Sequence, residues 1–69
     1  MAIRTRITQM ARQRGLTAAE VGQRLHLYRS NLSAMDAGKR AVSLRTLARI
    51  GELLGCSPAD LIEIVWGSE

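Results

Sequence analysis

The sequence predicts an all-α fold of five short helices. Apolar residues recur at intervals of three and four, as they do on the buried face of a helix. Glycine and small polar residues stand at the ends of these stretches, where helices commonly end and begin. The alternation of β-branched and aromatic residues that predicts strands is not visible in a chain with one Tyr, one Trp and no Phe. With 69 residues, the chain is expected to form one domain over residues 1–69.

The first helix is predicted over residues 2–14. Ile3, Ile7 and Met10 lie at helical spacing on one face. Gly15 follows them at the position where a left-handed residue commonly ends a helix. We therefore expect this helix to pack its apolar face on the core and to end before Gly15.

The second and third helices are predicted over residues 18–25 and 28–36. Thr17 and Glu20 have the spacing of a capping box, in which each side chain accepts a hydrogen bond from the other residue's backbone amide. The connection between these helices is very short, and Gly38 ends the second of them. A pair of helices joined in this way is a helix-turn-helix pattern.

The fourth and fifth helices are predicted over residues 44–54 and 58–66. Ser43 precedes the fourth helix as an N-cap and Gly55 ends it. The fifth begins at Ser57-Pro58-Ala59-Asp60, with Ser as N-cap, Pro in the first turn and an acid after it.

The third predicted helix has one apolar face and one slim polar face. Leu32 and Met35 would hold it to the domain. The side chains left for a partner are Tyr28, Arg29, Ser30, Ser33 and Ala34. A helix with small outer side chains can enter a DNA major groove about 12 Å wide, and an arginine near its start can bond a guanine with two hydrogen bonds.

Charge is distributed unevenly along the chain. Residues 1–51 contain ten basic and two acidic residues, for a net charge of +8, whereas residues 52–69 contain four acidic and no basic residues, for a net charge of −4. Such asymmetry favours a polyanionic partner for the basic part, although basic faces also occur on proteins only for solubility.

Three stretches in order are typical of one family. LTAAEVG at 16–22, DAGKR at 36–40 and LLGCSPADL at 53–61 resemble the Cro/CI-type helix-turn-helix domain, also known as the XRE family or as lambda-repressor-like. The resemblance covers residues 16–62. It implies a compact five-helix fold and a regulator that binds operator DNA sequence-specifically as a homodimer, with the third helix in the major groove. A Cro-like repressor, a restriction controller or an antitoxin would fit this description.

The resemblance and the predicted faces together give a set of site residues. DNA-base contacts are expected from Tyr28, Arg29, Ser30, Ser33 and Ala34, and DNA-phosphate contacts from Thr17, Asn31, Lys39, Arg40 and Arg45. For Lys39 and Arg40 the alternative is a favourable interaction with the helix dipole alone. For Arg12 and Arg14, in the last turn of the first helix, that alternative is preferred. Arg49 is expected to be solvated and able to pair with Glu52.

Several positions depart from the pattern that the family shows. Ala18 stands where a Gln is common, and Gly22 where an Ala is usual. His26 occupies the place of the turn glycine, so a left-handed backbone there would be strained. The Arg–Glu pair that often braces the first helix against the third is replaced by Ala11 and Asp36, which leaves the brace either absent or rebuilt from Arg12 or Arg14.

The predicted last helix has more apolar residues than one buried face requires. Ile64 and Trp66 are left over, and they are expected to form a dimer interface, because a core this small favours assembly. The alternative is that this end of the chain folds back on the first helix.

Other function classes receive little support. His26 and Cys56 do not make a metal-ligand set, and no group of residues has the spacing of a catalytic site, so we expect no metal, no cofactor, no small-molecule ligand and no enzyme activity. No apolar run is long enough to cross a membrane, and a cytoplasmic location is expected. The alternative function is a protein-interaction module of the same fold, such as a toxin-binding antitoxin, in which DNA contact is secondary.

Overall fold

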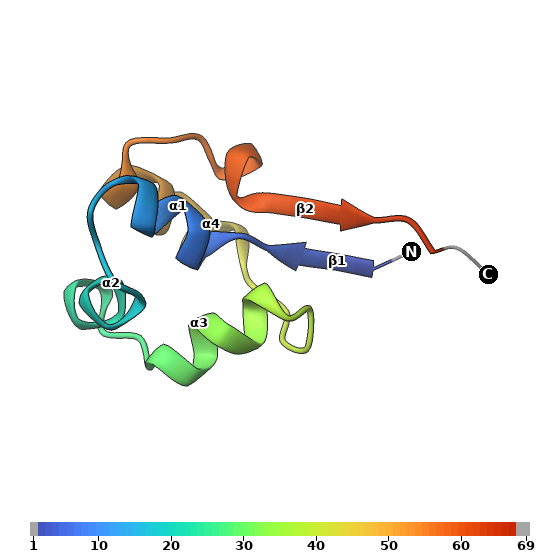
Figure 1. The fold of residues 1–69 in the computed structure, drawn as a ribbon, viewed down its shortest axis with the longest axis horizontal. Coiled ribbons are helices and arrows are strands. Elements are labelled where there is room, and N and C mark those ends of the chain that lie inside the picture. The colour runs from blue at the N-terminus through green and yellow to red at the C-terminus, as the bar shows by residue number, and fades with distance from the viewer. Residues whose placement is uncertain (1, 68–69) are drawn as a thin grey trace.

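The computed structural model describes residues 2–67. In this range the chain forms a body of four α-helices and one 3₁₀ turn, from which a two-stranded ribbon extends to the right in Figure 1. In chain order the elements are β1 (Ala2–Thr5), α1 (Ile7–Gln13), α2 (Ala18–Leu25), α3 (Arg29–Asp36), α4 (Leu44–Leu54), η1 (Pro58–Leu61) and β2 (Ile62–Val65).

The prediction of a five-helix, all-α fold is wrong at both ends of the chain. Residues 2–5, expected at the start of the first helix, form β1, and the expected last helix is divided between η1 and β2. The two strands pair antiparallel, with Ala2 opposite Val65 and Thr5 opposite Ile62. β-Branched side chains suit a paired strand better than a helix, and each strand satisfies the backbone groups of the other. Ile62, Ile64 and Val65 supply three such side chains in the four residues of β2.

The helices between the two strands follow the prediction closely. α2 and α4 have the expected bounds, and α3 begins one residue later than expected, at Arg29. The capping box of Thr17 and Glu20 is present, and the Ser43 side chain caps α4. Ser57 caps the next element as predicted, but that element is the short 3₁₀ turn η1 and not an α-helix.

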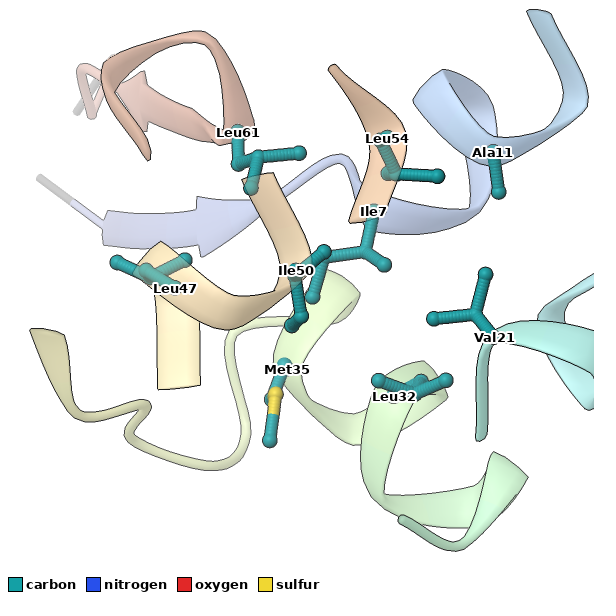
Figure 2. Packing of buried hydrophobic residues seen from close by; sticks show 9 residues of the cluster. All are labelled: Ile7, Ala11, Val21, Leu32, Met35, Leu47, Ile50, Leu54 and Leu61. Carbon is teal, nitrogen blue, oxygen red and sulfur yellow. The ribbon is translucent and has the colours of Figure 1, made fainter. Parts of the chain in front are cut away.

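The core lies where the four helices and η1 meet, and it holds α3 in place (Figure 2). Leu32 and Met35 are the buried side chains of α3, and they point toward the side chains of Val21 and Ile50. Burying a side chain of this size contributes about 1.5–3 kcal/mol, so these two residues fix which face of α3 remains outside. In residues 2–67 the buried apolar cluster consists of Ile7, Ala11, Val21, Leu32, Met35, Leu47, Ile50, Leu54 and Leu61.

The turn between α2 and α3 is tight because Gly22 lacks a side chain. A Cβ atom on Gly22 would lie 2.4 Å from the carbonyl oxygen of Leu27. The Leu27 amide donates a 2.8 Å hydrogen bond to the Gly22 carbonyl, and His26 between them adopts the left-handed conformation with φ of 59°. The left-handed backbone considered for His26 is therefore present, and it directs the chain into α3.

Candidate nucleic-acid interface

The residues predicted to read DNA lie on the outer face of α3. Arg29, Ser30 and Ser33 are exposed, whereas Ala34 is half-buried. Tyr28 is the N-cap residue of α3 and is 78% exposed. α3 forms the lower edge of the molecule in Figure 1, and the exposure of Arg29, Ser30 and Ser33 leaves this face of the helix available to a partner.

Asp36, the last residue of α3, joins this helix to the start of α1. Its carboxylate accepts hydrogen bonds from the backbone amides of Ile7 and Thr8, at 2.8 and 3.0 Å, and from the Thr5 hydroxyl at 2.5 Å. α1 needs these bonds because its own N-cap residue, Arg6, provides no side-chain cap. The brace between the first and third helices is therefore made by Asp36 and backbone amides, and not by Arg12 or Arg14.

Two arginines of the basic part are used to hold helix ends. Arg14 donates a 2.9 Å hydrogen bond to the carbonyl of Leu54 at the end of α4. Arg49, expected to be solvated and able to pair with Glu52, is exposed and donates a 3.1 Å hydrogen bond to the carbonyl of Leu25 at the end of α2. Guanidinium groups at such sites satisfy carbonyls that have no partner within the helix. These two positive charges are therefore structural.

A hollow lies at the junction of α1, α2 and α3, and it brings together residues from separate parts of the site. Arg29 and Ser33, predicted to contact bases, line it beside Thr17, predicted to contact phosphate. Arg12 also lines it, although an interaction with the helix dipole was the interpretation preferred for this residue. The residues four positions before and after Arg12 are Thr8 and Leu16, so Arg12 has no acid to pair with along its helix. This missing partner is the signal in the sequence that could have identified Arg12 as a residue of the site. The full lining is Thr8, Arg12, Leu16, Thr17, Ala18, Ala19, Arg29 and Ser33.

Thr17 and Glu20 bond to each other at the start of α2. The Thr17 amide donates to the Glu20 carboxylate at 2.8 Å, and the Glu20 amide donates to the Thr17 hydroxyl at 3.1 Å. The bond from the Thr17 backbone amide is the main cause that holds the pKa of Glu20 below its ordinary value, so this carboxylate is ionised at neutral pH. For a phosphate, Thr17 can therefore offer the proton of its hydroxyl but not its amide.

The remaining predicted phosphate contacts are dispersed around α3. Lys39 and Arg40 are exposed in the loop that follows α3, and Arg45 is exposed in the first turn of α4. The Lys39 amide bonds the Ala34 carbonyl at 2.9 Å, which keeps this loop against the end of α3. Asn31 is half-buried and Arg40 lines a separate, largely apolar hollow beside the ribbon. Neither of these two residues lies on the hollow that holds Arg29.

The residues predicted to form a dimer interface are exposed on the ribbon and not on a helix. Ile64 is 47% exposed on β2, opposite Ile3 of β1, which is 59% exposed. Trp66, just beyond β2, is 73% exposed. The end of the chain does fold back, but as a strand paired with residues 2–5 and not as a helix end on α1, and the ribbon presents apolar side chains to solvent.

The fold and this surface define a helix-turn-helix protein. α2 and α3 are joined by residues 26–28, α3 presents a polar outer face, and basic residues surround it. Residues 6–66 match the family of Cro/C1-type HTH DNA-binding domains, to which the chain belongs. It is thus a DNA-binding protein of the transcription-regulator type, and the family is not one of enzymes.

One similar protein supports the family and one similar structure supports the fold. The chain is 36% identical over 64 residues to YozG of Bacillus subtilis strain 168, named as an uncharacterised HTH-type transcriptional regulator, and the match covers 91% of this chain and 76% of YozG. The crystal structure of a protein from Bacteroides fragilis, described as a candidate DNA-binding protein, has the same fold with a TM-score of 0.78. That likeness covers 88% of this chain and 98% of the other at 23% identity. Within residues 2–67, no helix has the length and apolar character that crossing a bilayer requires.

Proposed function

We propose that this protein regulates transcription by binding operator DNA sequence-specifically as a homodimer, with α3 in the major groove. Arg29 and its neighbours on the outer face of α3 would contact base edges, and Lys39, Arg40 and Arg45 would contact phosphates. The proposed class of regulator comprises Cro-like repressors, restriction controllers and antitoxins. A location in the cytoplasm belongs to the same proposal.

One observation supports this function best: Arg29 stands exposed at the first turn of α3 with no protein partner among residues 2–67. An arginine whose guanidinium bonds another part of the protein would be structural, as Arg14 and Arg49 are. A free guanidinium on a slim helix can instead place two N–H donors on the O6 and N7 atoms of one guanine. Leu32 and Met35 hold the opposite face of the helix in the core, so the direction of Arg29 is preset.

Dimer formation is proposed on the ribbon because apolar side chains are exposed there. Ile3 and Ile64 face each other across the two strands, and Trp66 follows. Covering such an apolar surface with a second copy removes it from water, which favours the dimer. A two-fold dimer would place two α3 helices on half-sites one helical turn of DNA apart, about 34–36 Å.

Binding to selected DNA at several salt concentrations tests the proposal. The full chain is used to select duplexes from a randomised pool, and the affinity for the selected duplex and for a scrambled one is measured by fluorescence anisotropy. We expect a clear preference for the selected duplex and an affinity that falls steeply with salt, with a slope of about −0.9 per phosphate neutralised. Equal, weak affinity for both duplexes would contradict sequence-specific binding.

A protein-interaction module is the second candidate function. The exposed apolar residues of the ribbon lie on a different part of the molecule from the outer face of α3, so they could bind another protein while DNA contact remains secondary. A complex with DNA that is insensitive to salt, or that forms only with a protein partner present, would favour this alternative.

A further inference from the structure

The hollow at the junction of α1, α2 and α3 has basic and hydroxyl side chains and no acid in its lining. The guanidinium-bearing side chains are Arg12, from the last turn of α1, and Arg29, from the first turn of α3. Thr17 and Ser33 add hydroxyl groups. Ala18 and Ala19 contribute only methyl groups, so the space between the polar side chains stays open.

The arginines of this hollow differ from those that the protein uses for its own structure. Arg4 pairs with Glu63, Arg6 bonds the Ile62 carbonyl, and Arg14 and Arg49 bond the ends of helices. Arg12 is exposed and has no hydrogen bond or ion pair with any part of the chain that the structure describes. Two unpaired positive charges beside one hollow repel each other. An anion bound between them would attract both, and these two attractions would outweigh the repulsion.

The groups around the hollow match the chemistry of a phosphate. Guanidinium groups bond phosphate oxygens with charge-assisted hydrogen bonds, and hydroxyl groups can add neutral ones. The Thr17 amide is already bonded to the ionised Glu20 carboxylate, so the arginines must supply most of the attraction. Arg12 also lines a neighbouring hollow beside Arg4 and Arg6, but Asp36 and Glu63 line that hollow too, so its charge is mixed and it does not compete as an anion site.

We propose that this hollow receives one backbone phosphate of the bound duplex and that Arg12 is its main ligand. The proposal rests on the proposed function, since it assumes that α3 lies in the major groove. Because Arg29 borders the same hollow, the phosphate held by Arg12 lies next to the base pair that Arg29 reads. Arg12 is then a positioning residue: it fixes how deeply Arg29 enters the groove.

The test determines whether Arg12 and one particular phosphate act through the same contact. The phosphates of the selected duplex are replaced singly by uncharged methylphosphonates, and affinities are measured for the wild type and for Arg12→Gln. The matched control is Arg24→Gln, because Arg24 is likewise exposed in the last turn of its helix but lies at the far end of α2 from Thr17. Circular dichroism checks that both variants fold.

We expect one methylphosphonate position, next to the base pair whose preference is lost in Arg29→Ala, to lower wild-type affinity about ten-fold. Arg12→Gln should lose about as much on unmodified DNA and nothing further at that position, and its salt slope should decrease by about one unit. Arg24→Gln should keep wild-type affinity within about two-fold and keep the sensitivity of that phosphate.

Two results would overturn the site while leaving the proposed function standing. In one, Arg12→Gln binds the selected duplex as tightly as the wild type does. In the other, Arg12→Gln loses affinity but remains as sensitive as the wild type at every phosphate, so that its charge acts only at long range. A wild type that shows no salt-dependent, sequence-selective binding would instead overturn the proposed function and the site together.

Discussion

The Thr5 hydroxyl donates a hydrogen bond to the carboxylate of Asp36, and this contact ties the ribbon to the end of α3. Thr5 is only 5% exposed, and it is the last residue of β1. The same carboxylate accepts the amides of Ile7 and Thr8. One side chain thus connects the strand pair, the first helix and the proposed reading helix.

Replacing Asp36 with Ala should destabilise the protein by about 2–3 kcal/mol, because a charged acceptor is lost and buried donors are left without a partner. The free energy of unfolding in urea measures this loss. Asp60→Ala is the control, since Asp60 caps only the exposed turn η1 and its removal should cost about 1 kcal/mol or less. Equal losses in the two variants would show that Asp36 is an ordinary surface cap.

Replacing Gly22 with Ala should destabilise the protein, although Ala is the better helix former by about 1 kcal/mol. The added methyl group would lie 2.4 Å from the Leu27 carbonyl oxygen, so the turn into α3 must shift. The net loss should be about 1–2 kcal/mol. Ala48→Gly, at an exposed position of α4, is the control for helix propensity: the side chain there is exposed to solvent, and the glycine variant should be the less stable one. A Gly22→Ala variant more stable than the wild type in thermal unfolding would contradict the close approach.

Arg29 and Lys39 should differ in what they contribute to DNA binding. Arg29→Ala should cost about 1–3 kcal/mol on the selected duplex and remove the preference at one base pair. Lys39→Ala should weaken selected and random DNA about equally and reduce the salt slope by about one unit, as expected for a phosphate contact. Arg29→Lys should also lose discrimination, because a single ammonium cannot replace the planar guanidinium.

Selection over a randomised duplex pool with each variant measures these preferences. If Arg29→Ala selects the same sequences as the wild type, Arg29 is one more phosphate contact and does not read a base. If Lys39→Ala changes the selected sequences, the division between reading on α3 and phosphate binding in the following loop is wrong.

The combined variant Ile64→Asp, Trp66→Ala should be monomeric at concentrations where the wild type is dimeric. The charge and the lost indole remove the apolar surface that a second copy would cover, and affinity for a duplex with two half-sites should fall far more than affinity for one half-site. Sedimentation velocity gives the oligomeric state. Tyr28→Ala is the matched control, because Tyr28 is 78% exposed at the start of α3 whereas Trp66 is 73% exposed beside the ribbon. A monomeric wild type at high micromolar concentration would disprove the dimer.

The parts of the fold that local signals determine were predictable from the sequence. Thr17 and Glu20 are three residues apart, and Ser43 and Gly55 adjoin the helix that they bound. Leu32 and Met35 are three residues apart on α3, which was enough to predict the inner face of this helix and therefore its outer face.

The ends of the chain could not be predicted in this way, because their structure depends on distant residues. Leu61, Ile62 and Val65 fit helical spacing, whereas Ile62 and Ile64 fit the alternation of a strand. Pairing with residues 2–5 decides between these patterns, and no local signal reports that pairing. The abundance of β-branched residues in β2 was the available hint.

The site was predictable only in part for the same reason. The outer face of α3 follows from helical periodicity alone. The roles of Asp36 and Arg12 require the packing of α1 against α3, since the bond from Ile7 to Asp36 joins residues 29 positions apart. In the same way, the structural role of Arg14 and Arg49 became visible only with the carbonyls that they bond, at the ends of α4 and α2.

The pairing of β1 with β2 has a consequence for the order of folding. The ribbon joins Arg4 to Glu63, which are 59 positions apart, whereas α2 and α3 are joined by residues 26–28 alone. Ile3 and Ile64 can therefore come together only after residues 62–65 have been synthesised. A homodimer built on the ribbon would then require both strands to be paired, so a chain that still lacks residues 62–65 could not contribute this surface.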